Sequence, residues 1–195
     1  VEYYKYLTKQ LKSGLSDIPD MGFHKDVWYD FKCYIKNIDF VGTIEVELYS
    51  DSNKEQYSLI VPAAGSDWVE VTTSLLSNAT EDGGFQIEVN GTGTFYIDTL
   101  ELCGDDSYGY GDQNWQYVTL SQDLLQSLKD LNPSFIRFPG GCLCEGESLS
   151  NLYNWKETIG PLYERKHYSN IWNVDEKGIA YDNTNAMGYH EYLQL

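Results

Sequence analysis

The stretch Phe135-Ile136-Arg137-Phe138-Pro139-Gly140-Gly141-Cys142 decides the fold of the carboxyl-terminal half of the chain. Its apolar start predicts a buried strand over residues 135–138, and Pro139 with the two glycines predicts a tight turn directly after it. Barrel enzymes keep their ligand-binding groups at such strand ends. Arg137 lies inside the apolar run, where an unpaired guanidinium is costly to desolvate, so we expect it to have a carboxylate or carbonyl partner.

A helix is predicted immediately before this strand. Leucines recur at helical spacing over residues 121–131, behind Ser121 as the amino-terminal cap. Asn132-Pro133 predicts the end of the helix. The order is therefore a helix that leads into a strand.

This junction and the residues after it resemble the family 51 α-L-arabinofuranosidases. The resemblance covers roughly residues 115–195 in register. It is carried by the ordered segments Pro133-Ser134-Phe135-Ile136-Arg137-Phe138-Pro139-Gly140-Gly141-Cys142, Glu145-Gly146, Tyr153-Asn154-Trp155-Lys156-Glu157-Thr158-Ile159-Gly160-Pro161, Glu164-Arg165, Ile171-Trp172-Asn173 and Met187-Gly188-Tyr189-His190-Glu191-Tyr192-Leu193-Gln194-Leu195.

The resemblance implies a (β/α)8 barrel with an accessory β-sandwich and a retaining reaction on arabinofuranosides. Retention needs two carboxyl groups about 5 Å apart, one as nucleophile and one as acid/base. By the family pattern both glutamates follow Leu195, and a further sugar-contacting glutamate precedes Val1. We therefore expect an internal segment of such an enzyme, with no catalytic residue of its own and no hydrolysis by this chain alone.

The resemblance also implies substrate-binding residues. It places Arg137 at the floor of the sugar site, although pairing with a neighbouring barrel strand is an equal alternative. Gly141 allows the tight turn, and Cys142 stands where some members have a sugar-contacting asparagine. Trp172 matches a tryptophan that walls the arabinose subsite, with core packing as the alternative.

The residues before this region predict an antiparallel β-sandwich. Alternating apolar and polar residues, rich in aromatic and β-branched types, are separated by turn residues every eight to twelve positions. The predicted strands cover 29–35, 43–49, 55–61, 68–72, 84–89 and 93–102. Residues 1–20 hold a short helix or a first strand, and the sequence leaves this open.

The expected fold class is mainly β with some α: a jelly-roll sandwich followed by an incomplete α/β segment of a barrel. The predicted domains are residues 1–103 for the sandwich, a glycine-rich acidic linker over 104–114, and 115–195 for the barrel segment. The sandwich resembles the carbohydrate-binding-module-like insert of many of these enzymes. Trp28 and Trp68, at strand starts, are the candidate glycan-binding residues, with core packing as the alternative.

Charge excludes two classes of partner. Thirty acidic against thirteen basic residues give a net charge of −17, which repels nucleic acid and anionic lipid. No apolar run approaches the length needed to cross a bilayer, and we expect no membrane association. An arabinose-containing polysaccharide or another neutral glycan stays compatible.

The cysteines and sequons suggest a secreted protein without a metal. Cys142-Leu143-Cys144 has the wrong spacing for a zinc site, and no His pair supplies further ligands, so we expect no metal and no cofactor. A bridge between Cys33 and Cys103 stays open. Asn78 and Asn90 are candidate glycosylation sites in turn-like stretches, and we expect an extracellular protein.

Two other functions remain open. The chain could be a stand-alone carbohydrate-binding module. It could also be a glycosylated structural or assembly protein, because an open barrel segment needs the rest of the enzyme or neighbouring protomers to cover its apolar surfaces.

Overall fold

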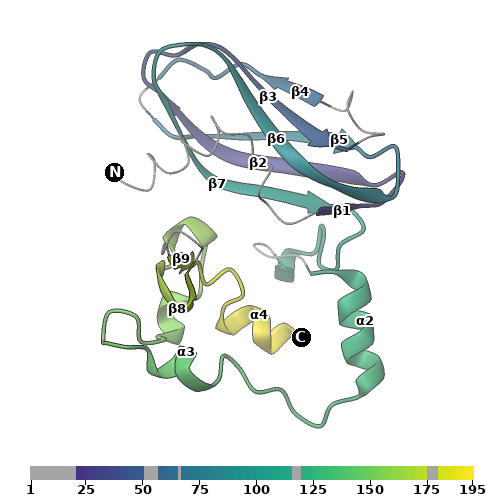
Figure 1. Ribbon diagram of the computed structural model, residues 1–195, viewed down its shortest axis with the longest axis vertical. Coiled ribbons are helices and arrows are strands. Elements are labelled where there is room, and N and C mark those ends of the chain that lie inside the picture. Colours follow the sequence, from purple (N-terminus) through teal and green to yellow (C-terminus); the bar gives the residue numbers. More distant parts are fainter. Residues whose placement is uncertain (1–20, 51–56, 66, 116–119, 175–179) are drawn as a thin grey trace. The chain divides into compact units, whose positions relative to one another are not determined.

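The computed structural model describes residues 21–50, 57–65, 67–115, 120–174 and 180–195, with side chains throughout except at residues 21, 170–174 and 180–182 (Figure 1). It divides into two compact units, one ending at Asp106 and the other beginning at Ser107. The division falls inside the predicted linker 104–114. The region 1–20, predicted as a helix or a strand, lies outside the described residues.

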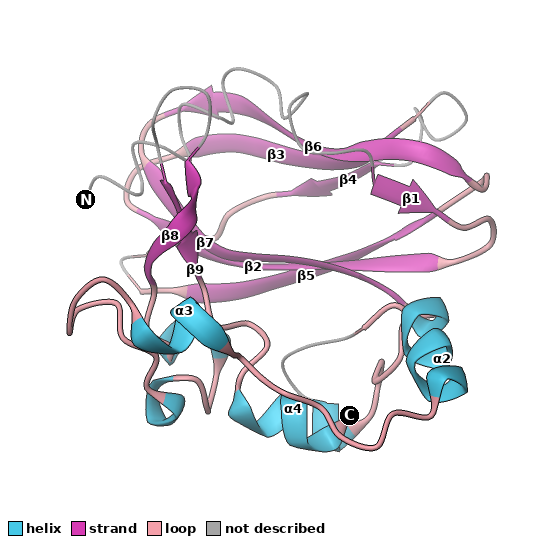
Figure 2. Cartoon of the chain, turned by 60° about the horizontal axis from the view of Figure 1, so that its bottom comes forward, coloured by secondary structure: helices cyan, strands magenta, loops and turns pink. Residues whose placement is uncertain are grey.

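The first unit is a two-layered antiparallel β-sandwich. One sheet has the order β1-β6-β3-β4 and the other the order β5-β2-β7, and Figure 2 shows the two layers one above the other. The strands are β1 (Met21–Phe23), β2 (Trp28–Asn37), β3 (Val41–Tyr49), β4 (Tyr57–Ile60), β5 (Val69–Leu76), β6 (Glu81–Thr92) and β7 (Phe95–Gly104). The predicted mainly-β class with a sandwich is confirmed.

Strict alternation along β2 and β3 explains why the two sheets pack. Phe31, Cys33 and Ile35 of β2 are buried, and so are Val46 and Leu48 of β3. Because successive side chains of a strand point to opposite faces, this period of two forms one apolar face on each sheet. Full burial of a side chain such as Phe31 stabilises the fold by roughly 1.5–3 kcal/mol.

A buried asparagine fixes the turn between β2 and β3. Asn37 accepts a hydrogen bond from the Phe40 amide at 2.7 Å and donates to the carbonyls of Phe40 at 3.0 Å and Pro62 at 3.3 Å. Its amide group is therefore satisfied inside the core, as a buried polar group must be.

The second unit has little regular structure. Its helices are α2 (Gln122–Leu131), α3 (Gly141–Glu145) and α4 (Tyr189–Gln194), with single 3-10 turns at Gln113–Trp115, Trp155–Glu157 and Leu162–Glu164. The predicted helix and its cap are confirmed, since Ser121 Oγ accepts a hydrogen bond from the Leu124 amide and Asn132 ends the helix in a left-handed conformation. None of the helices in the described part has the length and apolar character to span a bilayer.

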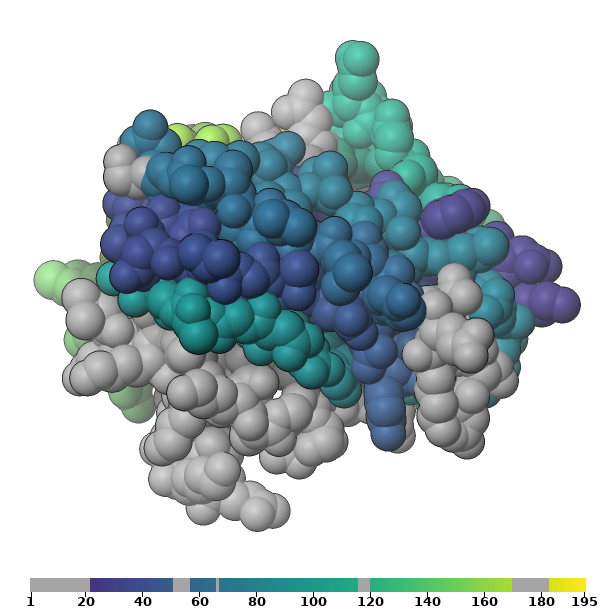
Figure 3. Space-filling model, turned by 90° about the horizontal axis from the view of Figure 1, so that it is seen from above, coloured from purple at the N-terminus to yellow at the C-terminus, as the bar shows by residue number. Residues whose placement is uncertain are grey.

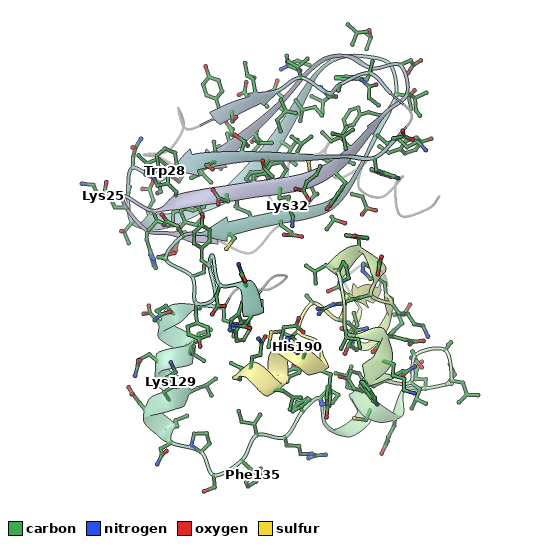
Figure 4. The ribbon with its side chains drawn as sticks, turned by 180° about the vertical axis from the view of Figure 1, so that it is seen from behind. Lys25, Trp28, Lys32, Lys129, Phe135 and His190 are labelled. Carbon is green, nitrogen blue, oxygen red and sulfur yellow. The ribbon has the colours of Figure 1, made fainter. Side chains whose placement is uncertain are left out.

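The predicted strand over 135–138 is wrong. These residues form no strand and pair with no strand among those described, and Phe135 is 81% exposed. A strand needs a neighbour for its amide and carbonyl groups, and the structure provides none here. Figure 4 shows the Phe135 ring pointing away from the chain.

The long loop predicted after this segment contains a hairpin that the sequence reading did not identify. β8 (Tyr168–Val174) pairs antiparallel with β9 (Ala180–Asn183), with Tyr168 opposite Asn183 and Val174 opposite Ala180. The aromatic and β-branched residues Tyr168, Ile171, Trp172 and Val174 were the available signal.

Candidate functional site

The candidate site is the turn over residues 137–142, at the start of α3. The Phe138–Pro139 peptide is cis, and Gly140 and Gly141 follow with φ of 75° and 52°. Positive φ favours glycine because a side chain would clash with its own backbone. Around Gly141 there is open space, so glycine is required here for conformation and not for room.

Aromatic stacking connects this turn to α4. The Phe138 ring stacks on Tyr192 with centroids 4.5 Å apart and an interplanar angle of 16°, and Tyr189 lies 5.8 Å from Phe138. Trp155 adds a tilted contact to Tyr189 at 5.2 Å. Burial raises the pKa of the Tyr192 hydroxyl. The position of the turn therefore depends on where α4 lies.

A buried ion pair holds the start of α4. Arg165 and Glu191 have side chains only 1% and 3% exposed, and the Arg165 Nη2 to Glu191 Oε1 distance is 2.6 Å. A second contact joins Nη1 to Oε2 at 3.1 Å, so the pair is bidentate. Glu191 Oε2 also accepts from the Gly188 amide at 2.9 Å. This geometry satisfies both carboxylate oxygens.

The remaining guanidinium donors bind backbone carbonyls. Arg165 Nη1 donates to Asn185 at 3.0 Å and to Ala186 at 2.8 Å, and Nε donates to Gly160 at 2.9 Å. One buried side chain thus ties two loops to the helix α4. Sequence reasoning placed Arg165 and Glu191 in matched segments but gave them no role, because their separation of 26 residues forms no local motif.

A buried threonine reinforces this arrangement. Thr158 Oγ1 donates to the Trp155 carbonyl at 2.9 Å and accepts from the Tyr189 amide at 2.9 Å. Its hydroxyl therefore joins the 3-10 turn at Trp155 to the first residue of α4. Tyr189 in turn contacts Phe138 of the candidate turn.

The structure brings three predicted substrate-binding residues into one turn, but it corrects the expectation for Arg137. Its side chain is exposed and makes no ion pair or hydrogen bond within the part of the chain described here. The expected partner is not needed, because an exposed guanidinium keeps its hydration. Gly141 and Cys142 are exposed beside it.

Cys142 borders a small hollow next to β8. The hollow is lined by Cys142, Leu143, Gly146, Asn151, Tyr168, Ser169 and Asn183. Tyr168 donates its hydroxyl to Asn185 at 3.1 Å, and burial raises its pKa. Trp172 belongs to the same strand β8, but its side chain lies outside the described residues, so its role in a sugar subsite stays a prediction.

The two candidate glycan-binding tryptophans lie far apart. Trp28, 47% exposed, begins β2, whereas Trp68, 41% exposed, precedes β5. The antiparallel register runs from Trp28 opposite Leu76 to Ile35 opposite Val69, and those seven steps correspond to about 23 Å. Trp28 lies at one end of the sandwich in Figure 4. The two rings therefore cannot form one platform for a short sugar.

The two sequons have different surroundings. Asn78 is exposed between β5 and β6, in the turn-like stretch expected. Asn90 lies within β6 opposite Thr43, not in a turn, because the pairing of β3 with β6 continues to Thr92. Its side chain is exposed and donates to Glu88 at 3.3 Å.

None of the four cysteines, all of which lie in described parts of the chain, forms a disulfide bond. Cys33 lies in the sandwich core, where burial raises the pKa of its thiol to about 12, while Cys142 is exposed. Within the described ranges, no group of His, Cys, Asp and Glu side chains is arranged to hold a metal ion.

Two glutamates of the second unit are paired with cations. Glu191 is held by Arg165, and Glu157 forms an ion pair with Lys166 at 3.3 Å. A retaining glycosidase needs two carboxyl groups free to act about 5 Å apart. These two glutamates do not supply such a pair.

Comparison with known proteins finds similarity to α-L-arabinofuranosidases. The family described as "Alpha-L-arabinofuranosidase 1 domain" matches residues 127–195. Alpha-L-arabinofuranosidase 1 of Arabidopsis thaliana is 35% identical over 176 residues, covering 86% of this chain and 23% of the relative. The probable alpha-L-arabinofuranosidase A of Aspergillus niger is 30% identical over 187 residues, covering 88% of this chain and 26% of the relative.

A bacterial relative extends the range of sources. The extracellular exo-alpha-L-arabinofuranosidase of Streptomyces chartreusis is 28% identical over 178 residues, covering 86% of this chain and 20% of the relative. The chain thus spans about a quarter of the length of the curated relatives that it matches. The similarity covers both the sandwich and the second unit, so over most of its length the chain is similar to α-L-arabinofuranosidases.

Proposed function

We propose that this chain is a non-catalytic segment of an α-L-arabinofuranosidase-like glycoside hydrolase. In this proposal the turn over residues 137–142 forms part of the sugar subsite, and the sandwich binds glycan. The observation that carries it is the pairing of Glu191 with Arg165 and of Glu157 with Lys166 in the same unit. The reactive carboxyl groups then belong to other parts of the enzyme.

The chemistry of the exposed turn supports a role in sugar binding. Arg137 offers guanidinium donors that are not engaged by any described residue, and such donors suit the oxygen atoms of a sugar. Gly141 leaves the backbone accessible next to Cys142. The thiol of Cys142 is itself a weak hydrogen-bond partner, so Arg137 is the stronger contributor of the two.

The expected ligand is an arabinose-containing polysaccharide in an extracellular setting. A net charge of −17 disfavours anionic polymers and leaves neutral glycans compatible. The relative from Streptomyces chartreusis carries "extracellular" in its name. Asn78 and Asn90 have exposed side chains, as glycosylation of a secreted protein requires.

An apolar hollow beside α2 supports the proposal that further segments of the enzyme pack against this unit. It is lined by Leu125, Leu128, Lys129, Asn132, Pro133, Phe135, Ile136 and Leu195. Exposed apolar surface of this kind marks a contact site in soluble proteins. In this proposal other segments of the enzyme, or neighbouring protomers, cover the hollow.

The test is an activity assay combined with a binding measurement. We expect no turnover of 4-nitrophenyl α-L-arabinofuranoside by this chain, with the Arabidopsis relative as the positive control. In an NMR titration with arabinose, we expect shifts in the amides of residues 137–142, and Arg137→Ala should abolish them. Turnover by the purified chain that persists in an independent preparation would refute the non-catalytic role.

A further inference from the structure

The outer face of the four-stranded sheet carries an exposed row of aromatic and polar side chains. Ile44, Val46 and Leu48 of β3 point into the core, so Glu45, Glu47 and Tyr49 point outward. Atoms of β3 and β4, indigo to blue, lie on the surface that Figure 3 shows.

The strand register brings side chains from three strands together on this face. Glu47 lies opposite Tyr57 of β4 on one side and opposite Gln86 of β6 on the other. Residues directly opposite each other in antiparallel strands share a face and have neighbouring side chains. Two residues earlier on β3, Glu45 lies on the same face between Leu59 of β4 and Glu88 of β6.

Two tyrosines of this face form a possible platform for a sugar ring. Tyr49 and Tyr57 are 55% and 53% exposed. Tyr57 lies opposite Glu47, two residues before Tyr49, so the tyrosines are diagonal neighbours roughly 7–8 Å apart at the backbone. Gly84 lies opposite Tyr49, and a Cβ built on it would meet nothing within 4 Å. Among the described residues, the space directly above Gly84 is therefore unoccupied.

The polar groups on this face are mainly hydrogen-bond acceptors. No described residue pairs Glu45, Glu47 or Glu88 with a cation, and burial together with the charges of Glu45 and Glu88 raises the pKa of Glu47. Ionised carboxylates accept hydrogen bonds but donate none, and sugar hydroxyls supply donors. Gln86 can both donate and accept. A negatively charged glycan would be repelled from the three glutamates.

We propose that the outer face of β4, β3 and β6, formed by Tyr49, Tyr57, Glu45, Glu47, Gln86 and Glu88, binds a neutral oligosaccharide and rejects uronic-acid-containing ones. The tyrosine rings cover the C–H faces of the sugar, while the carboxylates and the amide bind its hydroxyls. This inference rests on the proposed glycan-binding function of the sandwich, and it replaces Trp28 and Trp68 as the principal contacts.

Asn90 lies on the same face, so a glycan attached to it would compete with a bound oligosaccharide. It is opposite Thr43 and donates a hydrogen bond to Glu88. A glycan attached to Asn90 would therefore start beside the carboxylates of the platform. Binding should be measured on chain made in a bacterial host, which leaves this asparagine unmodified.

The test is an NMR titration of the unglycosylated chain with α-1,5-arabinopentaose, xylopentaose and a galacturonic-acid pentamer. We expect amide shifts confined to β3, β4 and β6 with one or both neutral sugars and none with the acidic one. Tyr49→Ala and Tyr57→Ala should each weaken binding about fivefold, because each variant removes one of the two rings that cover the sugar. Val69→Ala, which removes an exposed apolar side chain from the other sheet, is the control and should leave affinity unchanged.

The outcomes separate this inference from the proposed function. If neutral sugars bind but Trp28→Ala abolishes binding while both tyrosine variants bind normally, the glycan-binding role stands and this face is refuted. If neither neutral pentamer shifts any sandwich amide at millimolar concentration, glycan binding by the sandwich and this face are refuted together. Binding of the acidic pentamer as tight as that of the neutral sugars would refute the proposed selectivity.

Discussion

The Arg165–Glu191 pair allows a quantitative prediction for the substitution Glu191→Gln. Gln keeps the shape of the side chain but removes the charge that compensates a guanidinium only 1% exposed. Removing one partner of a buried pair typically costs about 3–5 kcal/mol, because the other charge stays buried without compensation. Arg165 keeps carbonyl acceptors at Gly160, Asn185 and Ala186, so we expect the lower end, about 3 kcal/mol.

Thermal unfolding, monitored by the NMR amide intensities of α2 and α4, measures this loss of stability in the second unit alone. For a unit of this size, about 3 kcal/mol lowers the melting temperature by roughly 12–24 °C. Glu164→Gln makes the same change at an exposed position and is the matched control. It should shift the melting temperature by no more than about one or two degrees. The double variant Arg165→Met/Glu191→Leu should be more stable than either single variant. A loss below about 0.5 kcal/mol for Glu191→Gln would refute the role of the pair.

Three further predictions concern a helix cap, a carboxylate and the thiols. Ser121→Ala removes the hydrogen bond from the Leu124 amide and should cost about 1 kcal/mol of unfolding free energy, measured by urea denaturation; an unchanged midpoint would contradict the capping role. The folded pKa of Glu47 is raised, so the folded state holds this proton more tightly and stability falls as pH rises from the ordinary value of 4.5 through the folded pKa. Glu47→Gln should therefore raise the melting temperature at pH 7 but not at pH 3, and an equal gain at both pH values would contradict this cause. Iodoacetamide should label Cys142 in the native chain within minutes, and Cys33 only after denaturation, as peptide mass mapping can show; native labelling of Cys33 would mean that the core opens readily.

Local patterns in the sequence were sufficient to predict the sandwich and α2. Alternation along β2 and β3 fixes both the strand type and the face that is buried, because every second residue is apolar. Ser121 and Asn132 mark the ends of α2 through interactions with nearby backbone. Such signals depend only on neighbours in the sequence, so a single sequence contains them.

Features that depend on distant partners could not be predicted in this way. The apolar run 135–138 has the composition of a buried strand, but no described strand lies beside it to accept its hydrogen bonds. The Arg165–Glu191 pair joins residues in different loops, and the stack of Phe138 on Tyr192 joins residues 54 positions apart. The grouping of Tyr49, Tyr57 and Gln86 becomes visible only once the register is known.

The exposed apolar side chains of Phe135 and Ile136 have a practical consequence for handling the protein. They offer a surface on which a second molecule can associate. Repulsion between chains of charge −17 counteracts that association at low ionic strength. Salt shortens the screening length to about 8 Å at physiological concentration, so a purification that ends in a dilute, low-salt buffer will keep these molecules apart, whereas a high-salt step will favour precipitation.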